Sequence, residues 1–289
     1  MAGNRITWDI GSYDPDTHYV YRSDAPMDPN SLPTPIATLG QGISVYEDTN
    51  NIVKGNTYYY RVDAEKMGLY IPGYEIKKLI YSYDVFGDNS ALSFYEFNGN
   101  ASSSGGTWPD ITLPSNTTFD TYNNIDYVKF DGTSNGTRND FLLQNLPSAE
   151  WTISFWAKQL NDGMLFNSSA VENTNDDFST VIRFSNSFYS SKNQNSSPTV
   201  SVPNDNNFHH YIMTKDTNNI ISVYLDGSFI DSASNSIDYT THYLMFGSRY
   251  RDNTTYKFEG GFTVFRSFNR NINDSEATLL YNELKDIQQ

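Results

Sequence analysis

The most constraining feature of this sequence is a succession of short segments in which apolar and polar residues alternate. Residues 58–64 (Tyr-Tyr-Tyr-Arg-Val-Asp-Ala) and 151–157 (Trp-Thr-Ile-Ser-Phe-Trp-Ala) show it clearly, and Asn, Asp, Gly, Ser and Pro separate such segments. Alternation with period two places successive side chains on opposite faces of a strand. The pattern therefore predicts an all-β protein made of packed sheets. The side chains expected to face a core are Tyr58, Tyr60, Val62, Ala64, Trp151, Ile153 and Phe155.

Composition excludes several classes of protein. The 289 residues include no Cys, which rules out disulfides, thiolate metal sites and a Cys nucleophile. The 34 acidic and 19 basic residues give a formal net charge of −15, which disfavours binding to nucleic acid or anionic lipid. No apolar run approaches the ~18 residues of a membrane-spanning helix, so we expect no membrane insertion. The 22 Tyr and 18 Phe indicate a folded chain with an aromatic core.

Three stretches near the N-terminus carry a family resemblance. Residues 55–64 read Gly-Asn-Thr-Tyr-x-Tyr-x-Val-x-Ala, Trp8 stands in an alternating segment, and residues 44–48 form another short segment. They are similar to strand F, the core Trp of strand B and strand E of a fibronectin type III module. The resemblance implies an immunoglobulin-like sandwich over residues 1–82. Such modules usually act as spacers or docking units, so it also implies an anchor without an active site.

A second resemblance covers residues 83–289, since residues 91–97 already alternate as a strand. The matching stretches, in order, are residues 130–132, 151–156, 208–210, 223–227 and 258–270. This order resembles the laminin G-like branch of the concanavalin A-like jelly rolls. The resemblance implies a jelly-roll sandwich and, as in many members of that family, calcium held by oxygen atoms at the rim.

One segment predicts a helix. Asn273 can cap its N-terminus while Glu276 reaches back from the third helical position. Leu280, Leu284 and Ile287 then lie roughly on one stripe, which we expect to pack on the edge of the sandwich.

Motifs for catalysis are missing from the sequence. Glucanases on this fold carry Glu-x-Asp-x-Glu on one strand, because both carboxylates must project from the same face. The adjacent acidic pair Asp176-Asp177 would point to opposite faces of a strand and lies in a polar stretch expected to be a solvated loop. No His-Glu-x-x-His, Gly-x-Ser-x-Gly or Walker-type pattern occurs. We interpret His209-His210 as strand residues that point opposite ways, one into the core and one to solvent. We therefore expect no catalytic residues.

Two kinds of binding site remain open. A glycan site needs hydrogen-bonding side chains beside an aromatic ring, and two loops combine them. The residues predicted to bind glycan are Tyr189, Asn193, Arg249, Tyr250, Arg251 and Asn253. A calcium site could use Asp131, Asp226 and Glu259 as oxygen donors. In the alternative interpretation, Asp131 and Asp226 form turns before glycine and Glu259 is solvated.

The favoured hypothesis is a non-enzymatic virion surface protein. A Cys-free chain with a Met start and no secretion signal resembles bacteriophage proteins made in the host cytoplasm, in a tail fibre, baseplate, neck or head decoration. The N-terminal module would contact other virion proteins within an oligomeric assembly, and the jelly roll would bind host-surface glycan. The alternatives are a purely structural decoration or adaptor subunit and a glycoside-active enzyme.

Overall fold

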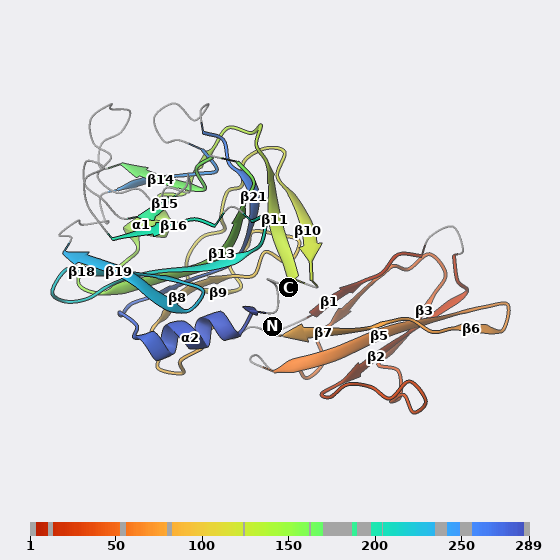
Figure 1. Ribbon diagram of the computed structural model, residues 1–289. Helices are drawn as coiled ribbons and strands as arrows, with labels where there is room; N and C mark the ends of the chain where they lie inside the picture. The colour runs from red at the N-terminus through yellow and green to blue at the C-terminus, as the bar shows by residue number, and fades with distance from the viewer. Residues whose placement is uncertain are drawn as a thin grey trace. The chain divides into compact units, whose positions relative to one another are not determined.

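The computed structural model describes residues 4–10, 14–52, 56–79, 83–123, 125–161, 163–169, 187–189, 198–203, 205–234, 242–248 and 256–285. Its contacts divide the chain into two compact units, Met1–Ser82 and Tyr83–Gln289. Both units are built mainly of strands (Figure 1), so the predicted all-β class is confirmed.

Two sheets form the N-terminal unit. One pairs β1 (Asn4–Thr7) with β4 (Val45–Asp48) in antiparallel register. The other has the order β3 (Ala37–Gly40), β2 (Thr17–Ser23), β5 (Thr57–Lys66) and β6 (Leu69–Ile71), and β7 (Glu75–Leu79) also pairs with β5. The core between them consists of buried Ile6, Tyr58 and Tyr60, with Trp8, Ile36, Ile52, Val62 and Ile76 packed against it and partly exposed.

Strand β5 has buried residues on both faces, although alternation predicts only one. Tyr58 and Tyr60 face the core as expected. On the opposite face Asp63 is fully buried, and its Oδ1 accepts hydrogen bonds from Arg61 Nε at 2.6 Å and from the Gly73 N–H at 2.7 Å. These partners compensate the charge, which explains how a carboxylate is buried there.

The C-terminal unit is a sandwich whose main sheet has nine described strands. We call it the large sheet. Its path runs β10 (Thr118–Tyr122), β11 (Ile125–Asp131), β21 (Glu259–Phe268), β13 (Trp151–Gln159), β17 (His209–Lys215), β18 (Ile220–Leu225) and β19 (Ser228–Ser234). Off this path, β8 (Ala91–Tyr95) pairs with β21 and with β9 (Gly105–Gly106). The small sheet has the order β12 (Thr137–Arg138), β20 (Tyr243–Phe246) and β14 (Phe166–Ser169), while β15 (Ser187–Tyr189) pairs with β16 (Thr199–Ser201).

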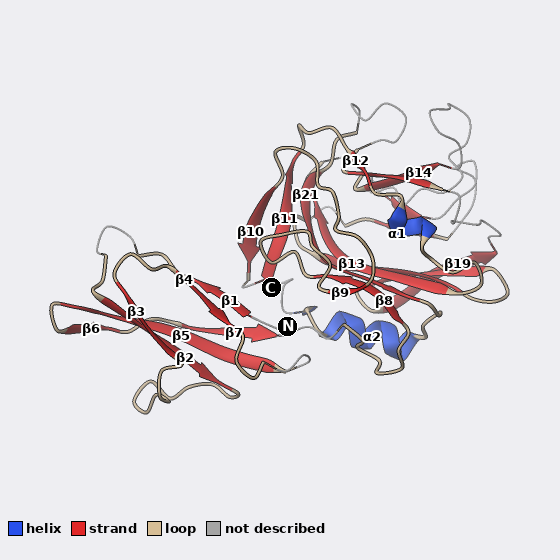
Figure 2. Cartoon of the chain, turned by 180° about the vertical axis from the view of Figure 1, so that it is seen from behind, coloured by secondary structure: helices blue, strands red, loops and turns tan. Residues whose placement is uncertain are grey.

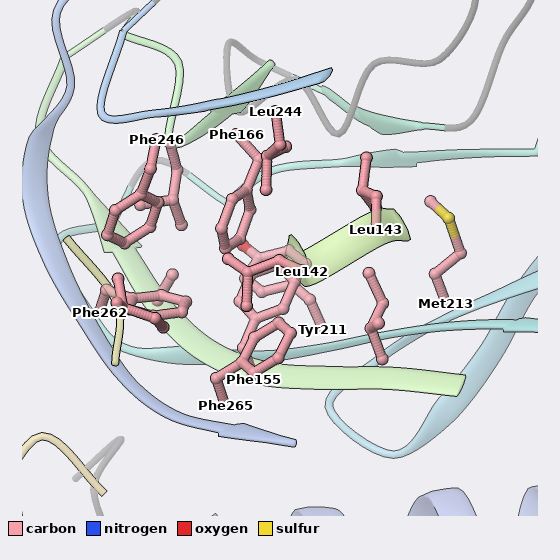
Figure 3. Close-up of a cluster of buried hydrophobic side chains, with 14 of the residues drawn as sticks. Leu142, Leu143, Phe155, Phe166, Tyr211, Met213, Leu244, Phe246, Phe262 and Phe265 are labelled. Carbon is pink, nitrogen blue, oxygen red and sulfur yellow. The ribbon is translucent and has the colours of Figure 1, made fainter. Parts of the chain in front are cut away.

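Aromatic rings fill the space between the large and the small sheet (Figure 3). Phe155 of β13 and Phe166 of β14 have ring centroids 5.2 Å apart, as do Phe246 of β20 and Phe262 of β21. Two leucines of the short helix α1 (Phe141–Gln144) are buried in the same cluster. Trp151, Ile153 and Phe155 all belong to this core, as the alternation of residues 151–157 predicts.

The opposite face of the large sheet carries α2 (Asp274–Asn282), so the small sheet and this helix lie on different sides of it (Figure 2). The side chain of Asn273 accepts the N–H groups of Ser275 and Glu276, and Glu276 accepts the N–H of Asn273, which confirms the predicted capping box. Leu280 and Leu284 are buried as expected, whereas Ile287 lies outside the described residues. Neither described helix is long and apolar enough to cross a membrane.

Candidate functional site

Polar side chains gather at the end of the large sheet where β11 ends and β21 begins. Asp131, the last residue of β11, is the cross-strand partner of Glu259, the first residue of β21. Asn161 follows β13, and Tyr256 and Lys257 precede β21. We call these five residues the rim cluster. They come from segments far apart in the sequence, and the sheet register brings them to one edge.

Asp131 ends β11 in a turn closed by its own side chain. Its Oδ1 accepts the Thr133 N–H at 2.8 Å, and its Oδ2 accepts the Thr133 hydroxyl at 2.6 Å. Gly132 follows with a φ of +73°, a left-handed conformation that favours glycine. A Cβ on Gly132 would lie 3.1 Å from the Cβ of Glu259. Glycine therefore lets the Glu259 side chain lie directly against the turn.

Asn161 connects the segments of the rim cluster. Its Oδ1 accepts the N–H groups of Glu259 at 3.0 Å and of Gly163 at 2.9 Å, and its Nδ2 donates to the Lys257 carbonyl at 2.9 Å. Lys257 Nζ in turn donates to the Thr133 carbonyl at 2.5 Å. These bonds join the ends of β11 and β13 and the start of β21 into one hydrogen-bonded edge.

The rim cluster combines charge with an aromatic surface. The hydroxyl of Thr133, and then its backbone N–H, hold the pKa of Asp131 below its ordinary value, so this side chain is an anionic acceptor at neutral pH. Tyr256 is 44% exposed. Carboxylate, amide and ammonium groups bind hydroxyl groups, and an aromatic ring packs on the apolar face of a sugar. The arrangement can therefore hold a hydroxyl-rich ligand.

A second polar cluster lies where β17 begins. His209 Nδ1 is 2.7 Å from Asp226 Oδ2, and its Nε2 is 3.1 Å from Asp205 Oδ1. Asp226 Oδ1 also accepts the His210 N–H at 2.9 Å. Burial alone would lower the pKa of His209, but the hydrogen bonds and charges of Asp226 and Asp205 outweigh burial and raise it. The His209 side chain therefore links the loop that holds Asp205 and the hairpin that holds Asp226 to the start of β17.

The three acids predicted to bind calcium are divided between these clusters. Asp131 and Glu259 meet in the rim cluster. Asp226 instead lies in the β18–β19 hairpin, where it and Gly227 have φ of +51° and +75°, the two-residue turn that Asp-Gly predicts. Because β13 and β17 lie between β21 and β18, Asp226 and Glu259 are three strand spacings apart, ~14 Å across the sheet, and they are also offset along the strands. Within the described residues no group of three His, Asp or Glu side chains could hold a metal ion. Calcium binding at Asp131 and Glu259 stays a prediction.

A buried Ser–His contact beneath the second cluster is structural. Ser154 Oγ lies 2.8 Å from His210 Nε2, and both residues are 1% exposed. Burial lowers the pKa of His210 to about 3, and its ring stacks on Trp156 with 5.0 Å between centroids. No substrate can reach this pair. The prediction that one residue of the His209-His210 pair enters the core is confirmed for His210.

Most residues predicted to bind glycan lie outside the described residues, as do Asp176 and Asp177. For Tyr189 only the backbone in β15 is described. The predicted glycan residues outside are Asn193, Arg249, Tyr250, Arg251 and Asn253. Three residues of the rim cluster, Asn161, Tyr256 and Lys257, were not among the residues predicted to bind a ligand. The available signals were an Asn-Asp-Gly turn at residues 161–163 and a Tyr-Lys pair directly before the Phe-Glu-Gly-Gly stretch.

Comparison with known families identifies the scaffold on which the rim cluster stands. The family model described as the concanavalin A-like lectin/glucanases superfamily matches residues 124–278, more than half of the chain. The chain belongs to this superfamily. The match covers β11 to α2 and so includes every residue of the rim cluster. The resemblance of the second part of the chain to concanavalin A-like jelly rolls is thereby confirmed.

Solved structures similar to this concanavalin A-like chain include domain 4 of AbnA, a GH43 extracellular arabinanase from Geobacillus stearothermophilus, in complex with arabinotriose. It shares 17% identity at a TM-score of 0.48, over 70% of this chain and 100% of that domain. The binding domain of botulinum neurotoxin serotype D/C shares 16% identity at a TM-score of 0.47, over 68% of this chain and 52% of the other. The binding domain of Paraclostridial Mosquitocidal Protein 1 shares 14% identity at a TM-score of 0.45, with the same coverage. This chain thus spans about half the length of the toxin domains. No curated protein matches the chain in sequence.

Proposed function

We propose that the C-terminal unit is a non-enzymatic glycan-binding domain and that the rim cluster is part of its site. One observation carries this proposal. Tyr256, which is 44% exposed, lies three residues before Glu259, the cross-strand partner of Asp131. Asn161 bonds to the N–H of Glu259 in β21 and to the carbonyl of Lys257 just before this strand. An aromatic surface beside fixed hydrogen-bonding groups is what recognition of a sugar ring requires. The membership of the concanavalin A-like superfamily supports it.

The environment of Asp131 does not suit the general acid of a glycosidase. A glycosidase needs one carboxylic acid that stays protonated near neutral pH, which requires a raised pKa. Asp131 has the opposite environment, because the hydrogen bonds from Thr133 stabilise its charged form. Asp131 therefore does not fit the role of the protonated acid in a glycoside-active enzyme.

A glycan array probed with the full chain tests the proposal. We expect saturable binding to a subset of surface glycans, reduced about tenfold by Glu259→Gln and by Tyr256→Asn. The first change keeps the size of the side chain, and Asn tolerates the positive φ of +52° at position 256. Tyr74→Ala, which removes a 93% exposed ring in the N-terminal unit, is the matched control and keeps full binding.

The outcomes separate the three functional hypotheses. Absence of binding to every glycan, with binding to a partner protein retained, would support a purely structural subunit. Release of reducing sugar from a bound polysaccharide would support an enzyme. Variants at Tyr250 and Arg251 belong in the same panel, since the sequence predicts them to contact glycan.

The wider role that we propose is attachment of a bacteriophage particle to its host. The Cys-free composition and the order of modules support it: a fibronectin type III-like N-terminal unit that contacts other virion proteins, followed by a jelly roll that displays the binding site. Gold-labelled antibody against the C-terminal unit, imaged on intact particles, tests this role. Label at a tail, neck or head surface is expected, and label that stays off the particles would refute it.

A further inference from the structure

The N-terminal unit contains a cavity of about 390 Å³. Residues from β1, β2 and β5 and from the segment 71–76 line it. Most of its described lining is apolar, and it includes Ile6, Trp8, His18, Tyr60, Ala64 and Tyr74. A volume of this size lies within the range of small-molecule sites, roughly 300–1,000 Å³.

The inner wall of this cavity carries polar atoms without partners. His18 projects from β2 toward the core beside its cross-strand partner Ala64, and it is only 1% exposed. Neither Nδ1 nor Nε2 of His18 makes a hydrogen bond, and the same holds for Nε1 of Trp8. The two rings lie 5.4 Å apart. A buried polar group without a partner is unfavourable, so its presence in a small core needs an explanation.

The cavity reaches from this polar wall to solvent. The charged residues on its described lining are Asp9, which is exposed, and Arg61. Tyr74, 93% exposed, stands at its outer end. The one buried cation on its described lining, Arg61, forms an ion pair with Asp63 on the other face of β5. The hydroxyl of Tyr60 donates to Asp48 at 2.8 Å, so this residue presents a ring and not a polar group. The inner part of the cavity is mainly apolar, with His18 and Trp8 as hydrogen-bonding groups.

We propose that this cavity binds a phenol group, supplied by a free phenolic compound or by a tyrosine side chain of a neighbouring protein. The ring would pack among Trp8, His18 and Tyr60, where aromatic contacts are favourable. A neutral imidazole offers one donor and one acceptor, and an indole offers one donor. A phenol hydroxyl both donates and accepts, so it can supply the hydrogen-bond partners that His18 and Trp8 lack, whereas an apolar ring cannot. The proposal concerns the N-terminal unit and is independent of glycan binding by the rim cluster.

Two matched pairs of probes test the proposal on the full chain. The first pair consists of p-cresol and toluene, the side-chain analogues of tyrosine and phenylalanine. The second pair consists of N-acetyl-tyrosinamide and N-acetyl-phenylalaninamide, which carry the same side chains on a backbone. The readout is the indole N–H signal of Trp8 in a ¹H–¹⁵N spectrum. The chain has four Trp, and the Trp8→Phe variant identifies this signal by its loss. We expect p-cresol to shift it saturably and to bind about fivefold or more tightly than toluene, the effect of one hydrogen bond.

Variants separate the polar groups from the cavity itself. Ala64→Leu fills the cavity and should abolish the binding of both analogues. His18→Phe keeps a ring but removes both nitrogens, so it should retain toluene and lose most of the preference for p-cresol, with only the indole N–H of Trp8 left as a donor. Tyr19→Phe, which removes a hydroxyl bonded to Glu65 on the opposite face, is the control and should change nothing.

Each outcome decides the proposal. Binding of both p-cresol and the tyrosinamide supports a tyrosine side chain as the natural occupant, and binding of p-cresol alone supports a free phenolic compound. A lack of saturable shift with every probe would mean that the cavity holds water only. Equal affinity for p-cresol and toluene, or an unchanged preference in His18→Phe, would also overturn it.

Discussion

The rings of Tyr281 and Trp156 stack with 5.7 Å between centroids and 14° between planes, and this contact joins α2 to β13. We expect Tyr281→Ala to lower the free energy of unfolding of the C-terminal unit by about 1–2 kcal/mol, because a partly buried aromatic pair is lost. Urea unfolding followed by tryptophan fluorescence measures it. Leu279→Ala, at a position 46% exposed on the same helix, is the control and should stay within about 0.5 kcal/mol of the natural chain.

An ion pair beneath α2 gives a second prediction. Arg266 Nη1 lies 2.6 Å from Glu283 Oε2, and both side chains are largely buried. Arg266→Met should destabilise the unit by about 3–5 kcal/mol, because it leaves the Glu283 carboxylate buried without its cation. The double variant Arg266→Met/Glu283→Leu should regain much of this loss. Equal stability of the single and double variants would contradict the interpretation.

The pKa of His209 makes stability depend on pH. Its pKa is raised above 6.5, so the native state binds this proton more tightly than the unfolded state does. The resulting stabilisation is fully present below about pH 6.5 and is lost as the pH rises through the native pKa. Unfolding of the natural chain and of His209→Asn at pH 6 and pH 9 measures it. The difference in the free energy of unfolding between the natural chain and the variant should be smaller at pH 9 than at pH 6. The same difference at both pH values would refute the prediction.

Replacing His18 should stabilise the protein. His18→Phe removes two buried nitrogens that make no hydrogen bond, so we expect the free energy of unfolding of the N-terminal unit to rise by about 1 kcal/mol. His210, another buried histidine, provides the contrast. His210→Phe leaves the Ser154 hydroxyl without its bond to Nε2 and should destabilise by about 1–3 kcal/mol. Thermal unfolding of both variants tests the pair of predictions, and a destabilised His18→Phe would count against the first.

Features decided by neighbouring residues could be predicted from the sequence. The capping box of Asn273 and Glu276 needs only a spacing of three residues, and the Asp226-Gly227 turn needs only two residues that accept positive φ. The core-facing side of residues 151–157 follows from period-two alternation. Local backbone geometry determines all three features, so one segment contains the necessary information.

Features that depend on distant strands could not be predicted. The register that pairs Asp131 with Glu259 is fixed by hydrogen bonds between strands far apart in the sequence. Alternation assigned Asp63 to a solvated face, but Tyr70 and Gly73 of the following segment donate hydrogen bonds to it and bury it. The position of His209 between two carboxylates depends on how a loop and a hairpin meet the start of β17.

The place of β21 within the large sheet also determines when this unit can form during synthesis. β21 is the last described strand in the sequence, yet it lies between β11 and β13 and pairs with β8 as well. While the ribosome still holds residues 259–268, β11 can pair with β10 and β13 with β17, but the strand that joins these two halves of the large sheet is missing. Closure of the large sheet must then wait until residues 259–268 have left the ribosome, an interval in which the nascent chain is open to chaperones or to association with other copies.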